Sequence, residues 1–172
     1  MTRISRAMTV VLWLVLAALA VAFVGVRLFG LTPYAVLSGS MEPEYPVGSL
    51  IYVTDVDPAA IQPGDNVTFH TSSGQIATHQ AYEVDAEMRQ IRTQGIANIN
   101  VDGTIMHDAE PVPFSQVIGK PVGCIPWLGY VNSFTASTPG RVVVIAVVVG
   151  AFILPSFTRR STPRHGASRR GE

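Results

Sequence analysis

Two long apolar segments, one near each end, constrain most strongly how this chain can fold. The first, Thr9–Val26, is an eighteen-residue run without a charged side chain. A membrane-spanning helix needs about 20 predominantly apolar residues, so we predict a span over residues 9–29. A cleaved secretory signal is the competing interpretation, because Arg3 and Arg6 precede the run. Signal-peptide apolar regions are shorter, about 7–15 residues, which favours an uncleaved anchor.

The second apolar segment, Val142–Phe157, is shorter, and a buried core helix is its alternative interpretation. The stretch "RRSTPRHGASRR" follows it, with five arginines and no acid before Glu172. Arginine clusters beside a span mark its cytoplasmic side. We therefore predict a second span over residues 141–157 and a basic cytoplasmic tail over residues 158–172.

The arginines at the two ends predict the same membrane orientation. Arg3 and Arg6 place residues 1–8 in the cytoplasm, so residues 30–140 lie on the extracytoplasmic face of the cell membrane. This middle region carries eleven acids and three bases, a net charge of −8. Such a balance argues against a nucleic-acid-binding protein. Cys124 is the only cysteine, so the chain can form neither an internal disulfide nor a cysteine-based metal site.

The middle region has the pattern of a β-rich domain. Short runs rich in β-branched and aromatic residues are separated by Pro, Gly, Asn and Asp. They are Ser49–Val53, Asn66–His70, Gln75–Val84, Arg89–Thr93 and Gln116–Val122. No helical periodicity is evident between Gly30 and Gly140. We predict a mainly β protein, in which a small antiparallel sheet domain is flanked by two transmembrane helices.

The segment Cys124–Val131 allows two interpretations. It is either a core strand or part of an apolar rim that rests on the outer leaflet of the bilayer. Trp127 and Tyr130 support the rim, because amphipathic aromatic residues are enriched at the level of the lipid headgroups.

Ser40, in "YAVLSGSMEPEYPVGSLIYV", is the candidate nucleophile. A serine hydroxyl needs a neighbouring base to remove its proton, usually a histidine or a desolvated lysine. Lys120 is the only lysine, and nothing in its sequence context marks it as desolvated. Of the extracytoplasmic histidines, His79 is favoured over His70 and His107 because it lies inside a predicted strand that would fix its ring.

An acid should orient the histidine and stabilise its charged form. Asp85, Asp102 and Asp108 are the candidates. The residues alone do not choose among them.

Several ordered blocks within residues 34–130 resemble the type I signal peptidases of peptidase family S26. These blocks are "SGSMEP" (Ser38–Pro43), "PGDNVTF" (Pro63–Phe69), a strand histidine, "QGIANINVDG" (Gln94–Gly103) and "VIGK" (Val117–Lys120). The resemblance is to the archaeal, endoplasmic-reticulum and spore-former type, which uses a serine–histidine pair in place of serine–lysine. It implies that Ser40 is the nucleophile, His79 the general base and Asp102 the acid. It also implies that Ser38, with the backbone N–H of Ser40, forms the oxyanion hole.

The resemblance further implies a membrane-bound serine endopeptidase that removes signal peptides from secreted precursors, with small residues at the first and third positions before the cut. The implied partners are signal peptides and the lipid bilayer, with the secretion machinery as a further candidate, and no metal or cofactor is needed. Three positions depart from the family pattern: Gln80 stands for an arginine, Ile96 for an aspartate and Ser49, after Gly48, for an acid. The first two support the alternative of a catalytically silent scaffold that only binds precursors. A cousin that cleaves itself or one regulator is a second alternative.

Overall fold

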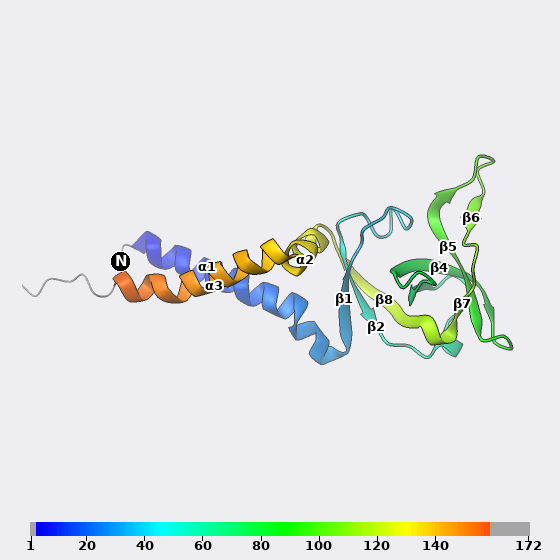
Figure 1. Cartoon of the computed structure of the whole chain (residues 1–172), viewed down its shortest axis with the longest axis horizontal. Helices are drawn as coiled ribbons and strands as arrows, with labels where there is room; N and C mark the ends of the chain where they lie inside the picture. The colour runs from blue at the N-terminus through cyan, green and yellow to red at the C-terminus, as the bar shows by residue number, and fades with distance from the viewer. Residues whose placement is uncertain (1–2, 159–172) are drawn as a thin grey trace, which may run out of the picture.

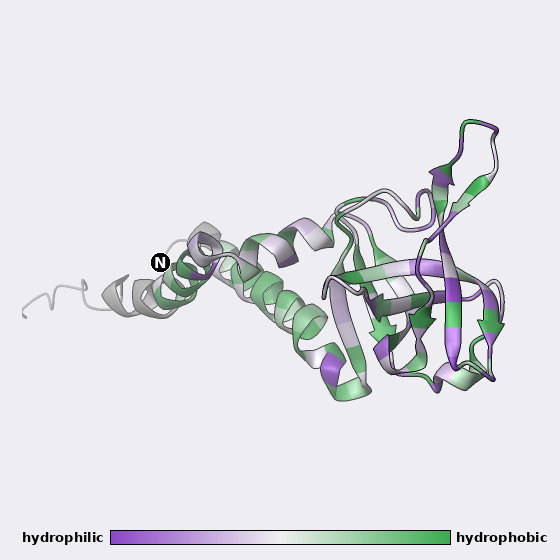
Figure 2. Cartoon of the chain, turned by 45° about the vertical axis from the view of Figure 1, so that its right-hand side comes forward, coloured by the Kyte–Doolittle hydropathy of each residue, from purple (hydrophilic) through white to green (hydrophobic). Residues whose placement is uncertain are grey.

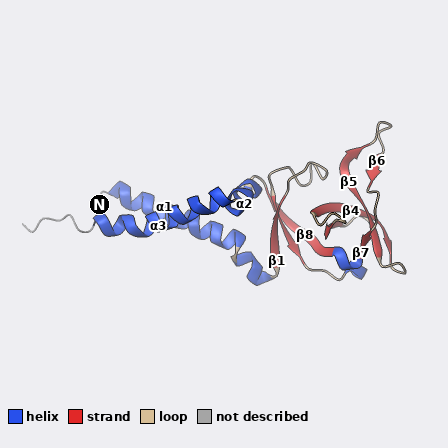
Figure 3. Cartoon of the chain, in the orientation of Figure 1, coloured by secondary structure: helices blue, strands red, loops and turns tan. Residues whose placement is uncertain are grey.

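The computed structural model describes residues 3–158, so most of the predicted basic tail lies outside the described residues. A β-domain occupies one end of the molecule, and two long helices extend from the same side of it (Figure 1). The β5–β6 hairpin protrudes at the end away from these helices (Figure 1). The α-helices and the strands are thus separated along the long axis (Figure 3).

The first helix, α1 (Arg3–Phe23), continues into a 3₁₀ turn, η1 (Gly25–Phe29). Together, Ala7–Phe29 is long and apolar enough to cross a membrane, and Figure 2 shows the hydrophobic colouring of α1. This agrees with the predicted first span. The other helices, α2 (Leu128–Ala136) and α3 (Thr138–Thr158), pass the same test only as a pair, over residues 128–151, and they are bent by 96° at their junction.

Antiparallel strands form one continuous sheet with the order β1-β2-β8-β3-β4-β5-β6, and β7 pairs with β5. The strands are β1 (Leu31–Ala35), β2 (Leu50–Thr54), β3 (Asn66–His70), β4 (Ile76–Asp85), β5 (Gln90–Ile99), β6 (Ile105–His107), β7 (Val112–Pro113) and β8 (Val117–Ile125). Two further 3₁₀ turns, η2 (Pro58–Ala60) and η3 (Phe114–Gln116), lie in the connections. The mainly β, antiparallel fold is therefore confirmed.

Each of the five predicted strand runs coincides with a strand, but the sequence pattern did not reveal β1, β6 or β7. The prediction that no helix lies between Gly30 and Gly140 is wrong, because α2 lies there. The core-strand interpretation of Cys124–Val131 is wrong beyond Ile125, where β8 ends. Trp127 has a positive φ of 64°, which breaks the extended backbone, and a helix of nine residues is too short to display a clear period.

Two apolar clusters hold the sheet together. The larger one lies under β3, β4 and β5 and consists of Ile61, Val67, Phe69, Ala81, Ile91, Val112 and Phe114. The smaller one consists of Met41, Tyr45, Ile51 and Val53, with Ile96 and Cys124 packed against it among others. Met41 directly follows Ser40 in the chain, so the smaller cluster anchors the loop that carries the candidate nucleophile.

Candidate active site

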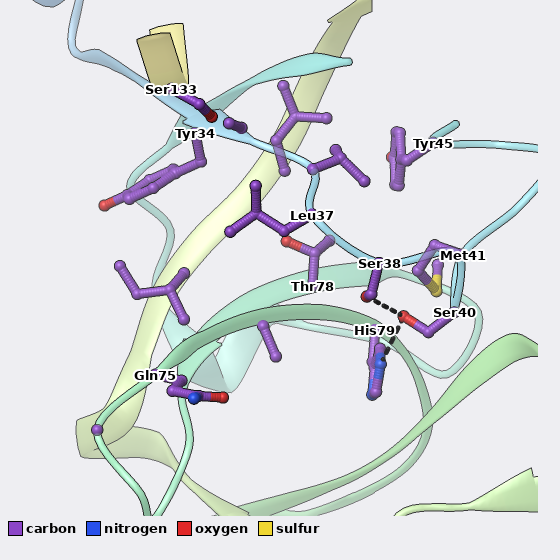
Figure 4. A pocket seen from close by; sticks show the side chains of 16 residues that line it. Tyr34, Leu37, Ser38, Ser40, Met41, Tyr45, Gln75, Thr78, His79 and Ser133 are labelled. Carbon is purple, nitrogen blue, oxygen red and sulfur yellow. Dashed lines mark hydrogen bonds between the residues drawn. The ribbon is translucent and has the colours of Figure 1, made fainter. Parts of the chain in front are cut away.

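Ser40 lies in the loop between β1 and β2, and contacts on both of its sides fix it. The side chain of Met41 is 2% exposed and sits in the smaller cluster. The carbonyl of Ser40 accepts a hydrogen bond from the N–H of Ala97 at 2.9 Å, which ties the loop to β5. The Ser40 backbone is therefore held between the core and a neighbouring strand, while its hydroxyl points into a cleft (Figure 4).

His79 extends from β4 towards this hydroxyl. Its backbone is in register with Val67 of β3, and its ring makes an edge contact with Phe69. The Nε2 atom lies 3.0 Å from Ser40 Oγ (Figure 4). The structure thus brings the predicted nucleophile and the predicted base into hydrogen-bond contact.

Asp108 lies behind the histidine. Its Oδ2 atom is 2.6 Å from His79 Nδ1 and accepts a second bond from Thr93 Oγ1, also at 2.6 Å. Since an ionised carboxylate can only accept, Nδ1 carries the proton and Nε2 is left to accept the proton of Ser40. Burial raises the pKa of Asp108, but the hydrogen bonds from His79 and Thr93, together with the charges of His79 and His107, lower it below its ordinary value. Asp108 is therefore held ionised beside the imidazole.

The structure does not place Asp102 beside His79, and this corrects the expectation drawn from the family resemblance. Asp102 is exposed in the turn between β5 and β6, where its Oδ1 accepts bonds from the N–H and the hydroxyl of Thr104. These bonds lower its pKa. Asp85, the third acid considered, accepts bonds from Glu87 and Met88 in another turn.

The remaining candidate bases make other contacts. His107 lies on β6, and its ring stacks on that of Tyr82 with centroids 4.0 Å apart. His70 is exposed at the end of β3. The ammonium of Lys120 forms an ion pair with Asp65. Of these side chains, only His79 contacts Ser40.

A cleft of about 680 Å³ opens in front of the pair. One wall is formed by Tyr34–Ser38 and the other by Gly74–His79, with Ser40 and Met41 at one end. Ser38 Oγ lies 3.3 Å from Ser40 Oγ (Figure 4). A second hydroxyl is thus placed where an oxyanion hole for a reaction at Ser40 would need a donor.

Backbone groups on both walls face the cleft without a strand partner among the described strands. Just after β1, the N–H of Val36 bonds to the carbonyl of Ser49, and the carbonyl of Val36 accepts a bond from the N–H of Gly48, on the side of β2. The same groups of Ala35 and Leu37 therefore point to the open edge, because successive residues alternate. On β4, pairing with β5 begins only at Gln80, so residues 76–79 pair with β3 alone. Both walls of the cleft thus offer unpaired backbone edges to an extended peptide.

Gln80 and Ile96, two of the departures from the family pattern, occupy different surroundings. Gln80 accepts a bond from the side-chain amide of Gln94 at 3.2 Å, opposite it on β5. Ile96 packs against the smaller cluster with its aliphatic side chain. Neither residue contacts Ser40 or His79 through a side-chain hydrogen bond in the part of the chain that the structure describes.

The known proteins that this chain resembles are signal peptidases. Residues 7–88 match the family model described as signal peptidase, peptidase S26. Signal peptidase I W of Bacillus subtilis is 30% identical over 118 residues, which cover 63% of this chain and 62% of that protein. Signal peptidase complex catalytic subunit SEC11C of Rattus norvegicus is 27% identical over 124 residues, covering 69% and 65%. The matches thus span less than two thirds of the length of these relatives.

Proposed function

We propose that the chain is a member of the signal peptidase family, peptidase S26, whose family model and relatives it matches. We propose further that it is a membrane-bound serine endopeptidase that removes N-terminal signal peptides from secreted precursors. The observation that carries this proposal is the chain of contacts from Ser40 Oγ through the ring of His79 to Asp108. A nucleophile, a base and an orienting acid in hydrogen-bond contact are the parts that acyl transfer requires.

In the proposed reaction, Ser40 Oγ attacks the carbonyl carbon of the scissile peptide bond while His79 Nε2 takes the hydroxyl proton. The ionised Asp108 stabilises the resulting imidazolium. The hydroxyl of Ser38 and the N–H of Ser40 donate to the oxyanion. His79 then protonates the leaving amine, which releases the mature protein and leaves an ester on Ser40. Water, deprotonated by His79, hydrolyses this ester and releases the signal peptide.

The substrate is proposed to bind as an additional strand between β1 and β4. The outward backbone groups of Ala35 and Leu37, and those of residues 76–79, offer hydrogen bonds on both sides. In such a complex, main-chain bonds supply affinity and alternate side chains enter pockets. As in the family, we expect small residues at the first and third positions before the cut.

For the membrane topology, we propose that residues 9–29 and 141–157 both span the bilayer and that residues 30–140 face outwards. Arginines near both chain ends support this orientation. Single-cysteine variants in a Cys124→Ala background test it. An impermeant maleimide should label Val101→Cys in intact cells and Ser168→Cys only after the membrane is permeabilised. Labelling of Ser168→Cys in intact cells would contradict the second span.

The decisive test of function is cleavage of a labelled precursor by the wild type and by Ser40→Ala, both as full-length protein in lipid. We expect the wild type to release the signal peptide and Ser40→Ala to release none. A fluorophosphonate probe should label only the wild type. If the wild type binds the precursor without cleaving it and without reacting with the probe, the chain is a silent scaffold. Truncation of the enzyme itself, in the absence of precursor, would identify self-cleavage.

A further inference from the structure

The helix α2 contributes a residue to the cleft at the end opposite the nucleophile. Ser133 of α2 lines the cleft together with Tyr34 of β1. Figure 4 shows these two side chains at one end and Ser40 with His79 at the other. A peptide that lies along the cleft from Ser40 therefore meets α2.

The position of α2 relative to the nucleophile loop is fixed by two close backbone contacts. Gly129 packs against the carbonyl of Ser49 so closely that no side chain could be accommodated there. The ring of Tyr130 covers Gly48, where a Cβ would overlap the ring and the φ of +82° also favours glycine. Since Ser49 leads directly into β2, α2 is docked on the turn that closes the Ser40 loop.

We propose that α2 is an end wall of the substrate cleft, and that Ser133 is a specificity-determining residue which limits how many extended residues of a signal peptide fit between the cut and the bilayer. This inference rests on the proposed function. The wall of the cleft formed by the end of β1 and the residues after it runs from Tyr34 to Ser38. A paired strand advances residue for residue with its neighbour, so roughly five substrate residues fit between the cut and α2.

Three polar side chains around that end of the cleft, beside the apolar Ile76, can bond to a polar stretch of substrate. Ser133 supplies a hydroxyl, Tyr34 a phenol and Gln75 an amide. A precursor whose apolar, bilayer-embedded part begins fewer than about five residues before the cut would have to bring that part into this polar end. We expect such a precursor to be cleaved with a lower kcat/KM.

The test compares two labelled peptides with the same cut site, one with four and one with nine residues before it. Full-length protein in lipid is used, and the ratio of kcat/KM for the long to the short peptide is measured. Ser133→Trp narrows the passage beside α2 and should lower this ratio at least tenfold relative to wild type. The control, Ala136→Trp, is an exposed position on α2 outside the cleft lining and should keep the wild-type ratio.

An unchanged ratio in Ser133→Trp would overturn the inference while leaving the proposed function intact. If the wild type cleaves neither peptide, the proposed function fails and the inference with it. A partly misfolded variant does not disturb the result, because both rates fall together.

A crosslinking experiment gives a readout without catalysis. Peptides carrying a photoreactive benzophenone at the fifth or the second position before the cut are bound to the Ser40→Ala protein. The fifth position should crosslink to residues 128–136 and the second should not. No crosslink to α2 from the fifth position, or equal crosslinks from both, would overturn the inference.

Discussion

The carboxylate of Asp108 lies 2.6 Å from Nδ1 of His79 and holds the ring with its Nε2 atom 3.0 Å from the hydroxyl of Ser40. The second bond that Asp108 accepts, from Thr93, fixes the carboxylate from the neighbouring strand. Thr93 on β5 and Asp108, directly after β6, therefore fix which ring nitrogen of His79 carries the proton and where the ring points.

Replacing Asp108 by asparagine should lower kcat by about 10²- to 10⁴-fold, because the amide no longer stabilises the imidazolium or fixes its tautomer. Asp102→Asn is the matched control, since its carboxylate bonds within its own turn, and it should keep activity near that of the wild type. Rates of precursor cleavage measure both. A large loss in Asp102→Asn with little loss in Asp108→Asn would restore the assignment drawn from the family pattern.

Sequence reasoning paired Ser40 with His79, which are in contact in the structure, but it named Asp102 where the structure places Asp108 beside the histidine. The family resemblance assigned the acid to Asp102, six residues before Asp108. What brings Asp108 to the histidine is the register of the β5–β6 hairpin, in which the N–H of Asp108 bonds to the carbonyl of Thr93. That register depends on β6, whose three residues are all exposed and show no alternation of apolar side chains. The signal needed to choose Asp108 was therefore absent from the local sequence.

Ser38→Ala should reduce kcat by about 10²- to 10³-fold with little change in KM. A donor that acts on the oxyanion contributes about 2.7–4 kcal/mol in the transition state and little in the ground state. Ser115→Ala, an exposed serine in η3, is the control and should behave like the wild type. A rise in KM with an unchanged kcat would instead assign Ser38 to ground-state binding.

The Asp65–Lys120 pair predicts a small dependence of stability on pH. Burial raises the pKa of Asp65. The hydrogen bond and charge of Lys120 and the bond from Gln62 lower it by more, so the pKa lies below its ordinary value. A lowered folded-state pKa contributes stability that is present above the unfolded value, about 3.9, and is lost as the pH falls through the folded value. Both side chains are partly exposed, so we expect about 1 kcal/mol or less.

Denaturant unfolding of wild type and Asp65→Asn at several pH values measures this contribution, because the other titrating groups cancel in the difference. The wild type should be the more stable protein at neutral pH, and the difference should shrink below about pH 4. A difference that stays constant down to pH 3 would contradict the pairing.

The Lys120→Ala variant should still cleave precursor. If it were inactive while His79→Ala remained active, the base would be the lysine.

The predicted strands were found because each carries β-branched residues that pack into one of the two clusters. Val67 and Phe69 of Asn66–His70, for example, are buried in the larger one. The helix α2 was missed for the opposite reason. Its placement depends on the glycines Gly48 and Gly129, which admit a ring and a carbonyl from distant parts of the chain, and such contacts leave no periodic pattern.

Gly48→Ala should destabilise the protein by about 1–3 kcal/mol, because it combines a strained positive φ with overlap against the ring of Tyr130. In a Tyr130→Ala background the overlap is removed, so the cost of Gly48→Ala should be smaller there. Unfolding free energies of the four proteins form a double-mutant cycle. An equal cost in both backgrounds would mean that Tyr130 does not pack on this turn in solution.

Trp127 is expected to rest in the headgroup region of the bilayer. The side chain is 78% exposed, so it is not part of the core, and it stands directly before α2, which leads into α3. In bilayers, with Trp13 replaced by Phe, Trp127 fluorescence should be blue-shifted relative to water and quenched by shallow lipid-attached quenchers. Val101 lies in the turn between β5 and β6, and this hairpin points away from the helices (Figure 1). A tryptophan placed there as the only tryptophan should not be quenched.

Trp127→Ser should weaken cleavage of membrane-inserted precursors more than cleavage of a short soluble peptide, because only the former requires the site to be held at the membrane surface. Equal losses on both substrates, or no lipid quenching, would leave Trp127 as an exposed residue in water and remove the support for an apolar rim.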